Sequence, residues 1–231
     1  MSTMLTSTLV SKRANLGGRL NAMKKKTAFV TVIVLSLQAA CLAQTFEIKR
    51  GSDIALVPPS IKYPGQAKDI LRWTDRQGDH LLIFSEMLAP SKEDTLGRDA
   101  EIFAGHYLKT GGQWALQWKV TDFERDCPVD VGASFIPQSV AVTDLDNNHI
   151  PEVSFMYRTY CIGGVDPHSL KLIMYEGKQK FAIRGETVVN LPDQPVYGGS
   201  MKIDISFKSA PRTFEQFAVQ QWQRNRSHPL K

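Results

Sequence analysis

The 231-residue sequence has no acidic side chain before Glu47 and no apolar run long enough for a comfortable membrane-spanning helix. Such a helix needs about 20 apolar residues, and the run at 28–37 is about half that length. Six of the 28 basic residues lie before position 44, which leaves 22 basic against 23 acidic residues. The net charge of +5 therefore belongs to the N-terminal stretch, and it gives no support to nucleic-acid binding by the remainder.

The N-terminal stretch has the three parts of a secretory signal peptide. Lysines at 24–26 precede the apolar run, and mostly small residues follow it at 39–43. We predict that 1–22 are an upstream extension or misassigned start and that 23–43 are a signal peptide. Residues 44–231 would then form one β-rich domain, periplasmic or secreted, with no transmembrane segment. The alternatives are an uncleaved membrane anchor and a lipoprotein anchored at Cys41, although Gln38 departs from the usual lipoprotein site.

Cysteine is scarce, since the chain has three, and Cys41 falls in the predicted leader. Cys127 and Cys161 remain as an even pair, which in an oxidising compartment usually forms a disulfide. We predict this disulfide, which would close a loop of about 35 residues. The alternative is a catalytic thiol, for which the sequence identifies no histidine base.

Catalytic signatures are also absent, because the chain contains no H-x-H, H-E-x-x-H or G-x-S-x-G motif. His106 and His168 are the best-placed histidines, but lone histidines of this kind are usually structural. Asp122, Glu124 and Asp126 would share one face of a strand, and a carboxylate pair could hydrolyse a glycosidic bond only at about 5–9.5 Å across a cleft. Such a row is more often a solvated edge, so no catalytic or cofactor-binding residue is assigned.

Between residues 68 and 190, short apolar runs alternate with turn residues in the pattern of β-hairpins. Four hairpins are predicted, with strand pairs at 69–74 and 80–88, 101–109 and 114–121, 140–143 and 152–157, and 170–175 and 180–184. We therefore expect a mainly β fold, an antiparallel meander forming a sandwich, a barrel or a propeller-like arrangement. A helix over 214–224 is expected to cover the sheet with one apolar face, and 90–99 and 190–200 are expected to be polar loops.

Trp114, Leu116, Trp118 and Val120 alternate along one predicted strand, so we expect them to share a buried face. Trp73, Tyr157 and Tyr160, like these tryptophans, could instead stack on sugars. The alternation favours a mainly structural role for the aromatic residues.

The loop at 144–152 has the residue types of a metal-binding site. Asp144, Asp146, Asn148 and Glu152 offer side-chain oxygens at alternate positions, and Ile150 offers a backbone carbonyl. Ca²⁺ takes six to eight oxygen ligands, which such a loop delivers from one side. The spacing matches the first part of D-x-[DN]-x-[DN]-G, but strands flank it and Phe155 stands where an EF-hand has glutamate. We predict a structural Ca²⁺ site at these five residues, the alternative being a plain turn held by Asx hydrogen bonds.

The same loop resembles the calcium loops of integrin-like FG-GAP repeats, where D-x-D-x-[DN]-G-x-x-[DE] joins two strands. His149 stands where that pattern has glycine, at a position that usually needs a positive φ. We expect the loop to have a structural role with or without metal, because a closed, oxygen-saturated site leaves no open position for a substrate.

A wider resemblance extends over about two-thirds of the mature chain. Its segments are 118–128, 144–157, 170–178 and the Phe-x-x-Phe-Ala-x-x-Gln-Trp stretch at 214–222. They are similar to an uncharacterised family of exported bacterial proteins labelled as surface-polysaccharide biosynthesis proteins. The resemblance implies an envelope location and supplies no catalytic residue.

We therefore expect an exported, non-catalytic envelope protein that is structural or binds a glycan or a secreted protein. The alternative is a hydrolase or other enzyme acting on an envelope polysaccharide. A third option, an inhibitor or chaperone of another secreted protein, has no positive signal in the sequence.

Overall fold

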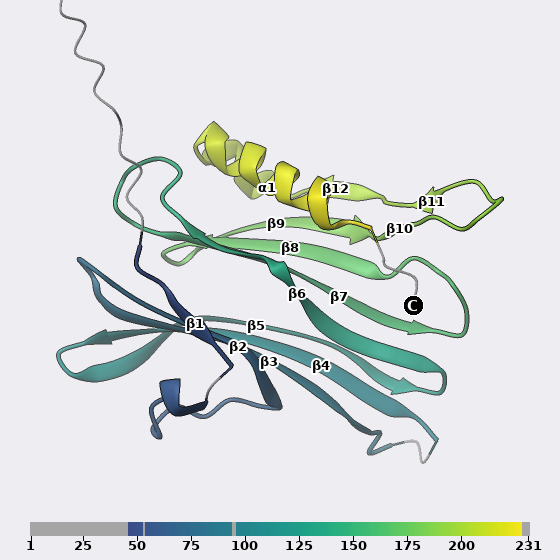
Figure 1. Cartoon of the computed structure of the whole chain (residues 1–231), viewed down its shortest axis with the longest axis horizontal. Helices are drawn as coiled ribbons and strands as arrows, with labels where there is room; N and C mark the ends of the chain where they lie inside the picture. Colours follow the sequence, from purple (N-terminus) through teal and green to yellow (C-terminus); the bar gives the residue numbers. More distant parts are fainter. Residues whose placement is uncertain (1–45, 53, 94–95, 228–231) are drawn as a thin grey trace, which may run out of the picture. The chain divides into compact units, whose positions relative to one another are not determined.

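Two antiparallel sheets of five strands each pack face to face in the computed structural model of the chain (Figure 1). The structure describes residues 46–52, 54–93 and 96–227, so the predicted upstream extension and signal peptide lie outside the described residues. The predicted mainly β class is confirmed, and among the three predicted arrangements the sheets form a sandwich. In these three segments, no helix has the length and apolar character needed to cross a membrane.

The first sheet is built from consecutive hairpins, so neighbouring strands in the sequence are neighbours in space. The turn between its last two strands contains Gly111 and Gly112, with φ of 58° and 84°. Two successive positive φ values suit a two-residue hairpin turn whose twist matches that of the strands. The strands are β1 (Lys49–Gly51), β2 (Gln66–Asp75), β3 (Gly78–Pro90), β4 (Arg98–Thr110) and β5 (Gln113–Cys127).

The second sheet has the order β12-β9-β8-β7-β6. Its long strands are β6 (Asp130–Thr143), β7 (Glu152–Ile162), β8 (Ser169–Glu176) and β9 (Gln179–Glu186), followed by β12 (Met201–Ile203). A separate short pair is formed by β10 (Val188–Val189) and β11 (Tyr197–Gly198), and β11 lies within the region predicted to be a polar loop at 190–200. That loop prediction is therefore wrong at 197–198, where a two-residue strand is too short to give a periodic sequence signal.

The main core lies between the two sheets. Phe84 from the first sheet meets Phe135 and Phe155 from the second, with ring centroids 4.8 and 5.1 Å away in edge-to-face arrangements. Such aromatic contacts add to the stabilisation from burial. Trp73, Trp118 and Tyr157 also belong to this core, as expected for aromatic residues with a mainly structural role.

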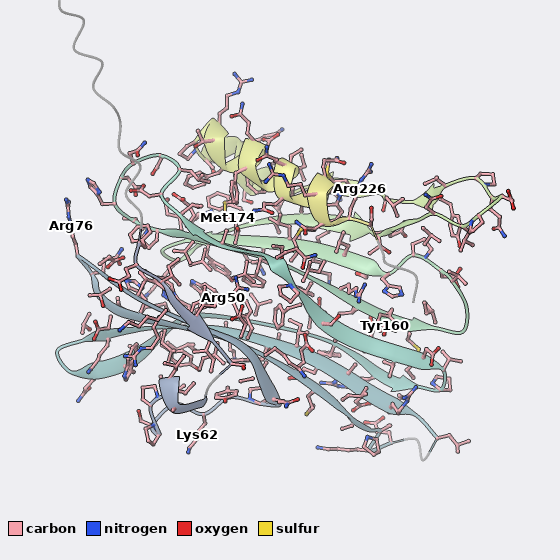
Figure 2. The ribbon with its side chains drawn as sticks, in the orientation of Figure 1. Arg50, Lys62, Arg76, Tyr160, Met174 and Arg226 are labelled. Carbon is pink, nitrogen blue, oxygen red and sulfur yellow. A yellow bond between two sulfur atoms is a disulfide. The ribbon has the colours of Figure 1, made fainter. Side chains whose placement is uncertain are left out.

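The opposite face of the second sheet is covered by the helix α1 (Arg212–Asn225), near the predicted position (Figure 1). Phe214, Ala218 and Trp222 of α1 are fully buried. They pack with β8 and β9 residues such as Met174, which is labelled in Figure 2. Because residues 172–175 of β8 are buried on both faces of the sheet, this part of the strand is a continuous apolar run rather than an alternating one.

The outer face of the first sheet is partly covered by the segment around the 3₁₀ helix η1 (Ile54–Leu56). A second 3₁₀ helix, η2 (Ile205–Ser209), precedes α1. Ile61 and Tyr63, just after η1, pack over Ile70 and Ile83 of the sheet.

The predicted shared face of Trp114 and Trp118 is wrong. Trp118 pairs with His106 and Leu116 pairs with Tyr107, so Gln117 is the extra residue of a β-bulge. A bulge shifts the alternation by one residue. Trp118 therefore lies in the core between the sheets, whereas Trp114 packs on the outer face of the first sheet and Leu116 is 48% exposed.

The predicted disulfide between Cys127 and Cys161 is confirmed, with Cα atoms 5.8 Å apart. It joins the last residue of β5 in one sheet to β7 in the other. The loop that it closes contains β6 and the acidic loop after β6. The bridge therefore links the two sheets close to the point where the chain passes from β5 in the first sheet to β6 in the second.

Candidate metal centre

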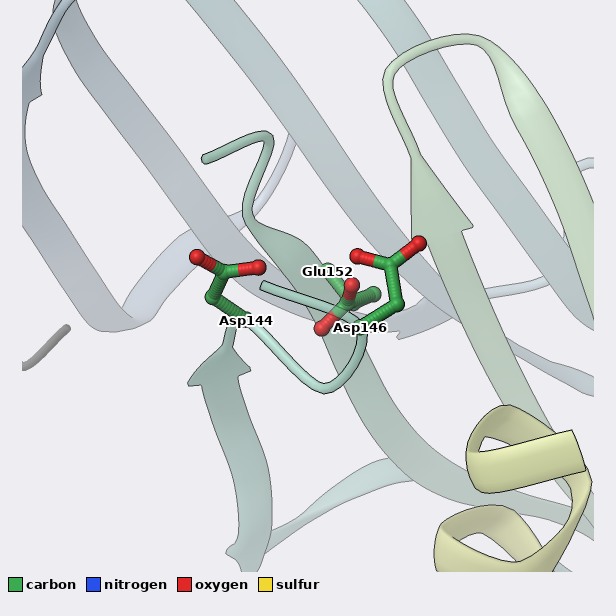
Figure 3. A group of neighbouring side chains, drawn as sticks. All are labelled: Asp144, Asp146 and Glu152. Atoms are coloured by element: carbon green, nitrogen blue, oxygen red, sulfur yellow. The ribbon is translucent and has the colours of Figure 1, made fainter. Parts of the chain in front are cut away.

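The acidic loop connects β6 to β7 and brings three of the predicted ligands together. Carboxylate oxygens of Asp144, Asp146 and Glu152 all lie within 4.8 Å of one another (Figure 3). Asp144 and Asp146 come from the loop, and Glu152 is the first residue of β7. Three carboxylates at this spacing form a group that could hold a metal ion.

The loop adopts this shape through local hydrogen bonds from backbone to side chain. The amide of Asn148 donates to Asp146 Oδ1 over 3.2 Å, and the amide of His149 donates to Asp144 Oδ2 over 3.2 Å. Asn147 and His149 have φ of 59° and 67°. His149 thus takes the left-handed conformation expected where the FG-GAP pattern has glycine, and both residue types tolerate it better than most.

Glu152 is fully buried, yet only one of its carboxylate oxygens is hydrogen-bonded. Oε2 accepts from Thr143 Oγ1 and from the amide of Leu145, both over 2.9 Å. Oε1 is buried with no hydrogen-bond partner. The pKa of Glu152 is raised to about 7, mainly by burial and also by the nearby charges of Asp146 and Glu176, while the hydrogen bonds from Leu145 and Thr143 act in the opposite direction.

Asp144 is in a similar position. Its side chain is 1% exposed, and its Oδ1 is buried without a hydrogen-bond partner. His149 Nδ1 lies 3.9 Å from Asp144 Oδ2. A buried carboxylate oxygen that accepts no hydrogen bond is costly, so the loop holds two groups that a bound cation would satisfy.

The side-chain oxygen of Asn148, a predicted ligand, points away from the three carboxylates. The Asn148 Nδ2 donates to Asp146 Oδ2 over 3.1 Å, while its Oδ1 accepts from the amide of Ile150 over 2.7 Å. The nitrogen, not the oxygen, therefore faces the carboxylates, and the amide must rotate before Asn148 Oδ1 can bind a metal. The Ile150 carbonyl as a ligand stays a prediction.

Sequence reasoning missed Glu176, the last residue of β8. It pairs with Glu152 across β7 and β8, and its Oε1 accepts from Asn148 Nδ2 over 2.6 Å. A fourth carboxylate therefore lies beside the loop. Among the described residues, no lysine or arginine forms an ion pair with any of the four carboxylates. Glu176 could have been predicted as a neighbour of the loop only by someone who knew the register in which β7 and β8 pair.

The three acids predicted to share a face of β5 do not form a pair across a cleft. Asp122 accepts a hydrogen bond from Tyr157 Oη over 2.9 Å and is ion-paired with Lys171. Asp126 has a φ of 53° after a shift in strand register, and it accepts instead from Ser91 Oγ. The expected common face of Asp122, Glu124 and Asp126 therefore does not extend to Asp126.

Both singled-out histidines lie in the interior. His106 is 7% exposed and its Nε2 lies 2.9 Å from His80 Nδ1, while His80 Nε2 lies 2.9 Å from Asp75 Oδ1. Burial and the neighbouring His80 lower the pKa of His106 to about 3. His168 is 4% exposed and stacks on Tyr160, with ring centroids 4.0 Å apart. Their surroundings are those of structural histidines.

No family model matches the chain, and no curated protein or solved structure matches it. The resemblances to FG-GAP loops and to exported envelope proteins therefore stay predictions. What the chain does has to be inferred from its own residues.

Proposed function

We propose that this chain is an exported, non-catalytic envelope protein whose sandwich is stabilised by one Ca²⁺ in the loop between β6 and β7 and which binds an envelope glycan or a secreted protein. One observation carries the metal proposal. Asp144 Oδ1 and Glu152 Oε1 are both buried without a hydrogen-bond partner, within a group of three carboxylates.

The donor set favours Ca²⁺ over other common metals. Asp144, Asp146 and Glu152 supply only oxygen, and the further candidates Asn148 and Glu176 supply oxygen too. Ca²⁺ takes six to eight oxygen ligands in flexible geometry, whereas Mg²⁺ demands a near-ideal octahedron. Zinc and copper prefer imidazole and thiolate ligands, and His149 is the one such side chain within the loop.

The proposed role of the ion is structural. It would connect the loop to the start of β7 through Glu152 and offset the repulsion among the carboxylates. Export is supported by the predicted signal peptide and by the disulfide between Cys127 and Cys161, a bond that is rare in reducing compartments.

A thermal melt tests the proposal. The purified protein is unfolded with excess Ca²⁺ and again with a chelator, without reductant, alongside Asp144→Asn and the control Asp130→Asn. Asp130 is exposed and lies outside the loop, so the control removes the same charge elsewhere. At 100 times its dissociation constant a ligand stabilises by about 2.7 kcal/mol, which for a domain of this size is roughly 5–10 °C.

We expect that increase in melting temperature for the wild-type protein and for Asp130→Asn, and none for Asp144→Asn. Equal melting temperatures of the wild-type protein in Ca²⁺ and in chelator would contradict the metal proposal. The loop would then be a turn held by its own Asx hydrogen bonds.

A further inference from the structure

A row of basic side chains lies on the second sheet, on the face that elsewhere packs against the first sheet. Strand register aligns Lys171 of β8 with Arg184 of β9, and Arg184 with Lys202 of β12. Phe181 and Ile183 of β9 pack toward α1. Side chains alternate along a strand, so Lys180 and Arg184 lie on the opposite face.

The first sheet does not cover Lys180, Arg184 and Lys202. Tyr157 of β7 and Ile173 of β8 are buried beneath the first sheet. Farther along the same face, the Arg184 side chain is 49% exposed, and Lys180 and Lys202 are exposed. The first sheet thus covers Ala182 of β9 but leaves Lys180 and Arg184 of β9 and Lys202 of β12 exposed. We call the surface around Arg184, together with the adjoining parts of β5 and η2, the basic ledge. Its cations are Lys119, Lys171, Lys180, Arg184, Lys202 and Lys208.

Two hollows meet on the basic ledge. One, of about 280 Å³, is lined by Lys119, Asp122, Lys171 and Lys180 together with Arg184. The other, of about 640 Å³, is lined by Arg184, Lys202, Asp204, Lys208 and Glu215, among others. Since Arg184 lines both, the two hollows adjoin, and together they offer room for several units of an extended ligand.

The charges on the ledge are only partly balanced. Lys171 is paired with Asp122, and Arg184 donates to Asp204 over 2.9 Å. Within the described part of the chain, Lys119, Lys180, Lys202 and Lys208 form no ion pair. Partial desolvation lowers the pKa of Lys180, and the charges of Arg184 and Lys171 lower it further, against the opposite influence of Asp122 and Asp204. The cations are therefore crowded, and an added anion would relieve their repulsion.

We propose that the basic ledge binds an acidic glycan, whose anionic groups pair with the free lysines and whose hydroxyl groups donate to the carboxylates of Asp122, Asp204 and Glu215. This deepens the proposed binding function by naming the ligand class, and it does not rest on the calcium site. Carboxylates among the cations suit a ligand that carries both anions and hydroxyl donors, whereas a polymer of phosphates alone would be repelled by them.

The aromatic residues of the ledge argue against single-stranded nucleic acid. Such binding depends on exposed aromatic faces on which bases stack. Tyr157 and Phe207, the aromatic residues lining the two hollows, are each 3% exposed. The ammonium group of Lys171 also lies 5.9 Å from the centre of the Tyr157 ring. Neither ring is open to a stacked base.

Calorimetric titration of the full chain tests the ledge. The probes are a galacturonic-acid hexamer, a neutral glucose hexamer, inorganic polyphosphate and a thymidine oligonucleotide, each in Ca²⁺ and in chelator. The variant is Lys180→Gln/Lys202→Gln, and the control is Lys62→Gln/Lys92→Gln, which removes two exposed charges elsewhere. We expect the acidic hexamer to bind more tightly than the other probes, with affinity falling as salt rises, and roughly tenfold more weakly to the variant than to the control.

Absence of binding by the acidic hexamer, or equal weakening in variant and control, would overturn the proposal. Equal affinity for polyphosphate or the oligonucleotide would also overturn it, because the ledge would then recognise charge alone. Binding that persists in chelator supports the ledge whatever the outcome for calcium. If Ca²⁺ raises the melting temperature but the acidic hexamer does not bind, the calcium proposal stands and the glycan proposal is wrong.

Discussion

Replacing Glu152 by glutamine separates the metal-site interpretation from a plain turn. Glutamine has nearly the same shape as glutamate, and its oxygen can accept the hydrogen bonds from Thr143 and Leu145 that Glu152 Oε2 accepts now. Its amide nitrogen would replace the unpartnered Oε1, within the group that contains the Asp144 and Asp146 carboxylates. Without metal, Glu152→Gln therefore removes a buried negative charge and adds a donor.

The size of the effect follows from the pKa of Glu152. Burial raises this pKa from 4.5 to about 7, so the folded state binds the proton more tightly than the unfolded state does. The resulting stability is present at low pH and is lost as pH rises from 4.5 through 7. At about 1.36 kcal/mol per pKa unit, the wild-type protein loses up to about 3 kcal/mol by pH 8. Relaxation of the loop would reduce this value.

The assay is urea unfolding in chelator at pH 5 and pH 8. We expect Glu152→Gln to be more stable than the wild-type protein at pH 8 and close to it at pH 5. With excess Ca²⁺ at pH 8 the order should reverse, since only the wild-type protein keeps the third carboxylate. A variant that is less stable in chelator at both pH values, and that still gains stability from Ca²⁺, would refute the reasoning.

Three further predictions concern the rest of the fold. Replacing Cys127 and Cys161 by serine removes a cross-link between residues 34 apart and should lower the free energy of unfolding by about 3–4 kcal/mol, measured by urea unfolding. Trp222→Ala empties a fully buried site beneath α1 and should cost about 3–5 kcal/mol in the same assay. Because burial lowers the pKa of His106 from 6.5 to about 3, its neutral form stabilises the fold above pH 6.5, and this contribution is lost as pH falls toward 3. His106→Leu should therefore show a shallower loss of stability over that range.

Each of these three predictions has a contradicting result. Equal stability of the serine variant and the oxidised protein would mean that the bridge does not restrict the unfolded chain. A Trp222→Ala cost below about 1 kcal/mol would mean that α1 does not depend on this contact. Parallel pH profiles for His106→Leu and the wild-type protein would show that His106 does not bind its proton less tightly in the fold.

Local patterns in the sequence predicted the parts of the fold that depend on local interactions. Turn residues predicted the hairpins, the apolar face of the stretch at 214–224 predicted α1, and the even pair of cysteines predicted the disulfide. The spacing of acidic residues likewise predicted that Asp144, Asp146 and Glu152 would come together.

The features that the sequence did not predict depend on how strands are paired. One inserted residue, Gln117, moves Trp114 to the other face of the first sheet. Glu176 reaches the acidic loop only because β8 pairs with β7 in one particular register. The basic ledge likewise depends on register, because Lys171, Arg184 and Lys202 are aligned only through the pairing of β8, β9 and β12.

Direct measurement of Ca²⁺ binding tests the central claim. Equilibrium dialysis of the purified protein, with Asp144→Asn as the matched control, counts the ions bound per chain. We expect one Ca²⁺ per wild-type chain and none for Asp144→Asn. No bound Ca²⁺ at millimolar free concentration, or equal binding by the two proteins, would contradict the account.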